Sequence, residues 1–351
     1  MVPGKAGGQR RRAPTVDIDG VVLLDKPEGL SSNAALQRAR RSFSASKAGH
    51  TGTLDPMATG LLPVCLGDAT KFSQGLLDAD KAYLATALLG VATDTGDREG
   101  QIVAQRPVDA TVAQVAAALA SLTGPLEQVP PMYSALKHQG QPLYAIARAG
   151  GEVVRAPRAV TIHALDLVEW DSPRLTFSVS CSKGTYVRTL AEQIAERLGT
   201  VAHLVALRRT AVGPFTLASS VTLAALEAAD PLQRQQYLRP ADALVQSLPA
   251  VVLCASDALG LLQGRTLQPC PAAAATPADG DAPVLVRLYG PSSLPGLRGT
   301  ADSDRAFLGV GAVEPGPDGA ARVRPMRLIA HAASPAGGEN DAIRPPAGET
   351  T

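Results

Sequence analysis

One carboxylate in this sequence stands in a setting that favours chemistry over packing. Asp55 lies in the segment GHTGTLDPMATG, residues 49–60, five residues after His50 and directly before Pro56. A carboxylate can serve as a nucleophile, a general base or a metal ligand. The proline restricts Asp55 to extended conformations, and the glycines of the segment leave room for a ligand to approach. On spacing alone, however, a turn aspartate that caps the next segment is the simpler explanation.

Two tyrosines and one arginine are further candidates for a site. Aromatic residues make up only 3% of the chain, so Tyr83 and Tyr186 stand out. A tyrosine in a strand usually belongs to the core, whereas in an RNA-binding site it can stack on a base. Arg188 could pair with Asp55 and keep the carboxylate ionised, or could be an ordinary arginine on a helix surface.

Other kinds of site find less support in the sequence. A metal site would need further ligands at suitable spacing, and only His50 and Asp68 are near Asp55. The segment TDTGD, residues 93–97, contains the Asp-Thr-Gly tripeptide of aspartic proteases, but that chemistry needs a second such carboxylate. We therefore predict a β-turn there. The glycine-rich loops of ATP-binding and dinucleotide-binding proteins are absent.

The elements around these residues alternate between strand and helix patterns. VDIDGVVLLDKP predicts a strand that ends at Pro27, followed by a helix capped by Ser31 or Ser32. KAYLATALLGVATDTGDREGQIV predicts two strands joined by a turn, and Thr111 begins a capping box for a further helix. RLTFSVSC alternates as a strand does, and the helix pattern after it places Arg188 in a first turn.

Composition divides the chain into four parts. Residues 1–16 and 332–351 are predicted to be disordered tails, the first of them basic. Residues 17–248 form the main domain, in which the proline-rich and basic segment of about 125–160 is predicted to be a mobile insertion. Residues 249–331 contain short strand-like runs between Gly/Pro-rich loops, as in a small β-barrel.

The distribution of charge suggests a polyanionic partner more strongly than the net charge does. The 351 residues carry a net charge of only +1, but residues 1–50 have nine Lys/Arg against four Asp/Glu. Arg38, Arg40 and Arg41 form one cluster and Arg208–Arg209 another. Apolar runs are far shorter than a membrane span, and no secretory signal is evident. The four cysteines are widely spaced, which does not suggest a disulfide framework. We therefore expect a cytoplasmic protein.

Long sequence blocks, in order, resemble the TruB family of bacterial tRNA pseudouridine synthases. They cover most of residues 17–248. The blocks are DKPEGLSSNAALQRARR (25–41), KAGHTGTLDPMATGLLPVCLGDATKFSQ (47–74), DKAYLATALLGVATDTGDREG (80–100), PPMYSALKHQGQPLYAIAR (130–148), CSKGTYVRTLAEQIAERLG (181–199) and AHLVALRRTAVGPF (202–215).

The resemblance implies a fold and an activity. It implies an α+β catalytic domain around a mixed sheet, with the mobile insertion closing over the substrate, and a small C-terminal PUA-like β-barrel that touches RNA. It implies isomerisation of the T-loop uridine at position 55 of tRNA, without metal or cofactor. The implied partner is the T-stem-loop of tRNA, and a monomer without an obligate protein partner or a membrane is the simplest expectation. The match weakens in the C-terminal part, where PCPAAAATPADGD lengthens a loop.

The resemblance also implies residue roles, with Asp55 as the catalytic aspartate. The residues expected to bind substrate are His50, Tyr83, Tyr186, Arg188, Leu207, Lys26 and Lys71. Arg188 would pair with Asp55, Tyr83 would stack on the flipped base, and Tyr186 and Leu207 would line the base pocket. Attack on the base at C6, attack on the sugar at C1′, and abstraction of a sugar proton are all compatible with these residues.

Two alternative functions are also compatible with parts of the pattern. A non-catalytic RNA-binding module could have the same fold, although the presence of Asp55, Tyr83 and Arg188 argues against it. An unrelated hydrolase could use Asp55 with His50, in which case it would release free uracil.

Overall fold

The computed structural model describes residues 15–268, 283–294, 304–315 and 321–329. The two predicted tails fall almost entirely outside these ranges. Contacts divide the chain into two compact units, Met1–Leu244 and Val245–Thr351. Each unit is described by itself below.

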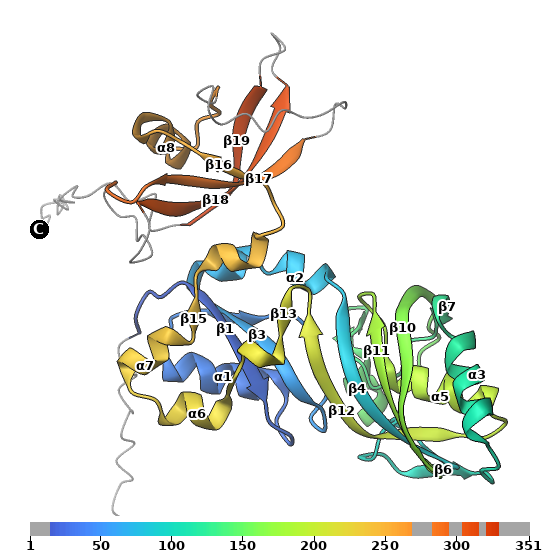
Figure 1. Cartoon of the computed structure of the whole chain (residues 1–351). Coiled ribbons are helices and arrows are strands. Elements are labelled where there is room, and N and C mark those ends of the chain that lie inside the picture. The colour runs from blue at the N-terminus through green and yellow to red at the C-terminus, as the bar shows by residue number, and fades with distance from the viewer. Residues whose placement is uncertain (1–14, 269–282, 295–303, 316–320, 330–351) are drawn as a thin grey trace, which may run out of the picture. The chain divides into compact units, whose positions relative to one another are not determined.

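A mixed sheet of eleven strands organises the first unit (Figure 1). Its main path runs in the order β14 (Val221–Thr222), β1 (Gly20–Lys26), β3 (Thr59–Leu66), β12 (Ala202–Val212), β4 (Lys81–Leu89), β11 (Arg174–Cys181), β10 (Arg158–Asp171) and β7 (Gly124–Gln128). Off this path, β2 (Ala48–His50) pairs with β3, β13 (Phe215–Thr216) with β12, and β15 (Leu238–Arg239) with β1. The β1–β14 and β3–β12 pairs are parallel and the others antiparallel. The predicted mixed sheet is therefore present.

Helices cover two hydrophobic clusters, one in each half of this sheet. The helix α1 (Ser32–Ser42) packs with α6 (Leu223–Ala228) against β1 and β3. The helices α3 (Val112–Ser121) and α5 (Val187–Arg197) pack against β4, β10, β11 and β12. β12 lies between the two halves, and its neighbours β3 and β4 belong to different clusters.

Local sequence signals explain where the main helices begin. The Ser31 hydroxyl accepts a hydrogen bond from the Ala34 amide, and Thr111 with Gln114 forms the complete capping box at the start of α3. These two predicted starts are confirmed. In β11, the alternation also holds, since Leu175, Phe177, Val179 and Cys181 are all buried.

The predicted pair of strands in residues 81–103 is divided differently. The chain turns at Gly90, whose φ of +88° suits glycine, and splits the first predicted strand into β4 and β5 (Val91–Thr93). β5 then pairs with β6 (Ile102–Gln105) in a separate two-stranded ribbon. The predicted turn TDTGD lies between them.

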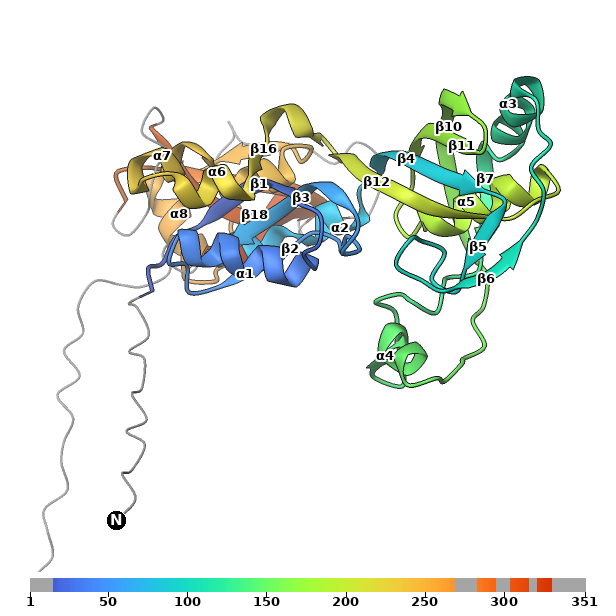
Figure 2. The same cartoon turned by 90° about the horizontal axis from the view of Figure 1, so that it is seen from below.

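The predicted insertion includes sheet strands at both ends. Residues 124–128 form β7 and residues 158–162 of β10 pair with it. Between them lie the hairpin of β8 (Lys137–His138) and β9 (Gln141–Pro142), and the helix α4 (Leu143–Arg148). Figure 2 shows α4 set apart from the main sheet.

Short elements complete the first unit. They are η1 (Gly67–Phe72), α2 (Gln74–Asp78), η2 (Leu217–Ser219), α7 (Pro231–Gln236) and η3 (Ala241–Val245), the last of which reaches the boundary between the units.

The second unit has a four-stranded sheet in the order β16 (Ala250–Val252), β17 (Val284–Pro291), β18 (Arg305–Pro315) and β19 (Ala321–Leu328). The helix α8 (Ala255–Leu262) packs against it. Leu267 also bonds to Val323 of β19 through both backbone amides. Among the described residues this sheet does not close on itself, so a β-barrel remains a prediction.

Candidate active site

A pocket of about 220 Å³ in the first unit contains the ion pair of Asp55 and Arg188. The residues that line it come from the loop between β2 and β3, from β4 and β12, from the insertion, and from the start of α5. The lining residues include Asp55, Tyr83, Ser134, Tyr186, Arg188 and Leu207. The sheet order explains this assembly, because β12 lies directly between β3 and β4.

Asp55 and Arg188 meet in a two-pronged contact. Arg188 Nε lies 3.1 Å from Asp55 Oδ2, and Nη2 lies 3.5 Å from Oδ1. The arginine side chain is only 5% exposed, whereas that of Asp55 is 31% exposed and faces the pocket. Burial raises the pKa of Asp55 above its usual value, and the Arg188 charge acts against that rise. The arginine therefore favours an ionised carboxylate at the pocket wall.

Arg188 is itself held by two segments that the sequence analysis did not connect with the site. Its Nη1 donates to the Thr95 carbonyl at 2.8 Å, and its Nη2 donates to the Tyr133 carbonyl at 2.7 Å. Asp97 is 4% exposed, and its Oδ2 lies 3.9 Å from Arg188 Nη1. The TDTGD turn is thus a buried support for the ion pair. Its sequence carried only a turn signal, so nothing in it pointed to this contact.

The loop that carries Asp55 is fixed from the β1–α1 connection. Ser32 Oγ donates to the Leu54 carbonyl at 3.0 Å and accepts from the Leu54 amide at 2.7 Å. Lys26 is fully buried, and its Nζ donates to the carbonyls of Pro27, Leu30 and Pro56. Burial lowers the pKa of Lys26 to about 8, while the Asp55 charge acts to raise it. Lys26 therefore lies behind the loop and does not line the pocket.

The two tyrosines and Leu207 that were predicted as base contacts all line the pocket. Burial raises the pKa of Tyr83, and Arg209 acts to lower it. Burial also raises the pKa of Tyr186, whose backbone amide donates to Gln128 Oε1 at 2.9 Å just before α5 begins. A pocket with two phenol rings and an aliphatic wall has the surfaces needed to hold a planar base.

His50 and Lys71 lie outside the residues that line this pocket. His50 ends β2, and its Nδ1 is buried without a hydrogen-bond partner. Burial lowers the pKa of His50, and the nearby Arg209 charge adds to this. Lys71 lies in η1 and pairs with Asp68 at 3.0 Å. Their expected RNA contacts remain predictions.

The two arginines of the Arg208–Arg209 pair differ in environment. Arg208 Nη2 pairs with Asp25 at 2.7 Å and is half-exposed, whereas Arg209 is only 1% exposed. Arg209, which was counted with Arg208 as a basic cluster that could attract a polyanionic partner, offers no exposed charge, because successive residues of a strand face opposite sides. The Arg38 side chain also forms an ion pair, with Glu227.

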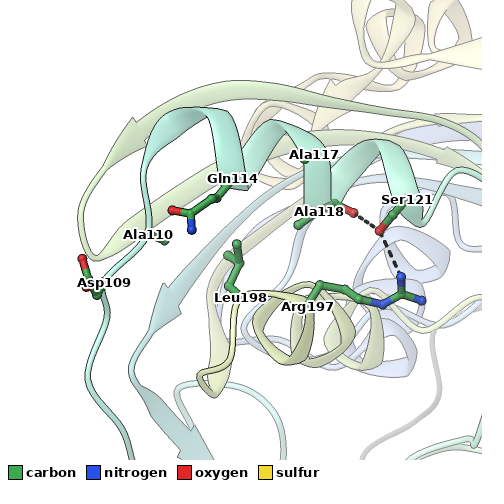
Figure 3. A pocket seen from close by; sticks show the side chains of 8 residues that line it. All are labelled: Asp109, Ala110, Gln114, Ala117, Ala118, Ser121, Arg197 and Leu198. Atoms are coloured by element: carbon green, nitrogen blue, oxygen red, sulfur yellow. Dashed lines mark hydrogen bonds between the residues drawn. The ribbon is translucent and has the colours of Figure 1, made fainter.

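A second pocket, of about 330 Å³, lies between α3 and α5 (Figure 3). Its polar groups are Gln114, Asp109 and Arg197, and Arg197 donates to Ser121 Oγ at 3.3 Å. None of the residues that the sequence predicted for the site lies there.

Within the described ranges, no group of three or more His, Cys, Asp or Glu side chains could hold a metal ion. No helix in the same ranges is long and apolar enough to span a membrane.

The fold resembles that of chains in two solved complexes. A structure described as a Cbf5–Nop10–Gar1 complex matches with a TM-score of 0.62 and 24% identity, over 91% of this chain and 82% of that one. A structure of an H/ACA RNP bound to a substrate RNA containing 2′-deoxyuridine matches with a TM-score of 0.63 and 23% identity, over 88% and 84%. The chain therefore shares the mixed α+β fold of these two chains, and a mixed α+β fold was predicted.

Comparisons of sequence give closer matches than the comparisons of structure do. Residues 40–187 match the TruB family pseudouridylate synthase N-terminal domain, and residues 188–246 match the tRNA pseudouridylate synthase B C-terminal domain. A protein of Aromatoleum aromaticum named tRNA pseudouridine synthase B is 53% identical, over 94% of this chain and 98% of its own length. A protein of Burkholderia lata with the same name is 55% identical, over 83% and 90%. The chain belongs to the TruB family of pseudouridylate synthases.

Proposed function

We propose that this protein isomerises the T-loop uridine at position 55 of tRNA to pseudouridine, with Asp55 as the catalytic carboxylate. Conversion of a tRNA uridine to pseudouridine follows from membership of the family and from the name of the close relatives. The position within tRNA and the residue roles are our proposal. The observation that carries them is the Asp55–Arg188 pair at a pocket walled by Tyr83, Tyr186 and Leu207.

The reaction explains why a carboxylate is placed in such a pocket. The C1′–N1 bond of the uridine breaks, the uracil rotates, and a C1′–C5 bond forms. The hydrogen at C5 leaves as a proton, and N1 takes up a proton, so the composition of the base is unchanged. No electrons are gained or lost overall, so an ionised carboxylate with hydrogen-bonding groups around it is a suitable catalyst. The uridine must leave its stack to reach Asp55, and two phenol rings can replace the lost stacking.

The remaining parts of the chain take supporting roles in this proposal. His50 and Lys71, which do not line the pocket, contribute contacts with the RNA around it, and the buried Lys26 holds the Asp55 loop through the Pro56 carbonyl. The insertion of about 125–160 closes over the stem-loop, which is supported by the contribution of Ser134 and Ala135 to the pocket wall.

The proposal also covers the organisation of the whole chain. Residues 17–248 act as the catalytic domain, and residues 249–331 form a PUA-like domain that adds contacts to tRNA. The protein works as a monomer in the cytoplasm, without an obligate protein partner, metal or cofactor.

Release of tritium from tRNA labelled at uracil C5 tests the proposed function. Bond formation at C5 must expel the label and leave the base on the RNA. An unrelated hydrolase would instead release labelled uracil, and a binding module would release nothing. A substrate tRNA with cytidine at position 55 should release no label from its other uridines.

Asp55→Asn tests the role of the carboxylate. Enzymes typically lower barriers by about 8–23 kcal/mol, and loss of the catalytic group should remove most of this, so turnover should fall below detection. Binding of tRNA should persist, because contacts with phosphates and stacking supply the affinity. Asp78→Asn removes an exposed carboxylate that pairs with Lys183, and should turn over within twofold of wild type. Turnover of Asp55→Asn within about tenfold of wild type would exclude Asp55 as the catalytic group.

A further inference from the structure

Arg209 is a buried cation whose role the family resemblance did not specify. It lies in β12 with 1% of its surface exposed, among the largest fully buried side chains. Within the described ranges its guanidinium forms no ion pair with a carboxylate, unlike Arg188 and Arg208. A buried guanidinium is costly unless its donors are satisfied, so its hydrogen bonds should reveal what it is there to hold.

Those hydrogen bonds bracket the loop that carries Asp55. Arg209 Nη2 donates to the Gly52 carbonyl at 3.1 Å, and Nη1 donates to the Thr53 carbonyl at 3.5 Å, both before Asp55. Nε donates to the Leu61 carbonyl at 2.7 Å, after Asp55. One side chain therefore joins the two ends of the irregular segment between β2 and β3.

Two glycines, Gly52 in this segment and Gly60 at the start of β3, lie next to Arg209. A Cβ on Gly60 would lie 2.3 Å from the Arg209 carbonyl oxygen, and the φ of Gly60 is +104°. A Cβ on Gly52, where φ is +120°, would lie 3.6 Å from Arg209 Nη1. Glycine is thus required where β3 passes the Arg209 backbone, and it accommodates the bend where the guanidinium reaches the loop.

The same arginine is next to the opposite wall of the pocket. Arg209 is the cross-strand partner of Tyr83 on β4, and Tyr83 lines the pocket. Its charge and a hydrogen bond act to lower the pKa of the Tyr83 phenol, against the effect of burial. A change in the position of Arg209 would therefore move the carboxylate loop and the phenol relative to each other.

We propose that Arg209 is a positioning residue that fixes the Asp55 loop against the Tyr83 strand, so that the base lies between carboxylate and phenol in reactive geometry. The inference rests on the proposed function, because it concerns the same reaction. Misplacement of reacting groups by about 1 Å can reduce a rate about 100-fold, so the effect should appear in catalysis and not in RNA affinity.

Arg209→Lys is the main test. Lysine keeps the positive charge but has one nitrogen, which cannot reach carbonyls on both sides of Asp55 as the guanidinium does. We expect single-turnover tritium release at saturating tRNA to fall about 100-fold, with the Kd for tRNA within twofold of wild type. Arg209→Gln removes the charge and keeps an amide donor, and should show the same pattern.

Arg234→Lys is a matched control, because Arg234 makes the same kind of contact elsewhere. Its guanidinium donates to the carbonyls of Leu226, Ser42 and Glu227, away from the pocket. Arg234 is half-buried, whereas Arg209 is buried. If arginines that join backbone carbonyls matter only for folding, both lysine variants should lower the unfolding temperature and neither should change the rate of the folded protein. We expect Arg234→Lys to lower that temperature while keeping the rate within twofold.

The outcomes separate this inference from the proposed function. If wild-type protein releases no tritium, the proposed function fails. If wild type is active and folded Arg209→Lys and Arg209→Gln are within threefold of it, only the positioning role is excluded. Failure of both variants to fold, while Arg234→Lys folds, would assign Arg209 to the folding core and also overturn the inference.

Discussion

Two opposing effects set the charge state of Asp55. Burial raises the pKa of its carboxyl, and the guanidinium of Arg188 opposes that effect. Because Arg188 also bonds to Thr95 and Tyr133, its position depends on the β5–β6 turn and on the insertion as well as on α5. The charge on the carboxylate is thus coupled to segments that approach the pocket from different sides.

Tyr83 offers a test of what an aromatic wall contributes. Tyr83→Phe keeps the stacking face, worth about 1–3 kcal/mol per base, and loses only the hydroxyl, whereas Tyr83→Leu loses both. If stacking alone matters, Tyr83→Phe should release tritium nearly as fast as wild type, and Tyr83→Leu should release it slowly. If the hydroxyl transfers a proton, both should be slow although Phe still binds tRNA. Wild-type rates in both variants would place Tyr83 outside the reaction.

Sequence reasoning reached the residues whose roles the family resemblance implies and missed those whose role depends on burial. Asp55 could be found because a proline and several glycines surround it. Asp97 and Arg209 look like a turn residue and half of a basic pair. Their burial depends on strands that are distant in sequence: Arg209 and Leu61, which it bonds, are 148 residues apart. No local pattern encodes such a meeting.

At the scale of elements, α1 connects the Asp55 loop with two basic residues at its own C-terminal end. Its first residue, Ser32, bonds to Leu54 beside Asp55, and its last turn carries Arg40 and the exposed Arg41. Arg38 on the same helix is occupied by Glu227. The end of α1 is therefore the part of this helix available to a phosphate backbone.

Charge reversal at that end tests whether it faces RNA. Arg40→Glu with Arg41→Glu should weaken tRNA binding and reduce the slope of log K against log salt by roughly 1 for each lost phosphate contact. The change also places negative charge at a helix C-terminus, which costs about 0.3–1 kcal/mol of stability, so the unfolding temperature should be measured in parallel. Arg197→Glu makes the same kind of change in the last turn of α5 and should leave the slope unchanged. An unchanged slope in the double variant would remove α1 from the RNA-binding face.

Elements with a regular period were predictable, and those with an irregular path were not. The alternation of Leu175 to Cys181 and the capping box at Thr111 each depend on neighbours within a few residues. The course of β4 into β5 depends on a bend at Gly90, and a glycine within an apolar run did not reveal whether the strand would bend. In the insertion, prolines marked the irregular segment, but the pairing of β7 with β10 at its ends needed the rest of the sheet.

At the scale of the whole molecule, the proposed active site belongs to one unit. Every residue that lines the 220 Å³ pocket lies within Met1–Leu244. The described residues of the second unit supply none of them, and this unit has its own hydrophobic cluster around β17 and β18. Its contribution to the reaction should therefore be to affinity for the substrate.

Truncation at Leu248 tests this division of labour. The shortened protein should modify an isolated T-stem-loop at saturating concentration with a kcat within about threefold of the full chain. Its KM for full-length tRNA should rise, because contacts outside the stem-loop are lost. Circular dichroism should first establish that the truncated chain is folded. A folded but inactive truncation would show that the catalytic unit extends beyond this boundary.

The position of β12 in the sheet has a consequence for how the protein is made. Residues 202–212 form the last long strand of the first unit to leave the ribosome, yet they lie between β3 and β4. Until they emerge, β4 has an unpaired edge and the start of β3 at Thr59 and Gly60 lacks its partner, and open strand edges favour association with other chains. The same strand brings Arg209 to the Asp55 loop. A nascent chain that stalls before β12 therefore has an open edge at β4 and an Asp55 loop that Arg209 does not yet hold, and it should depend on chaperones that shield strand edges during synthesis.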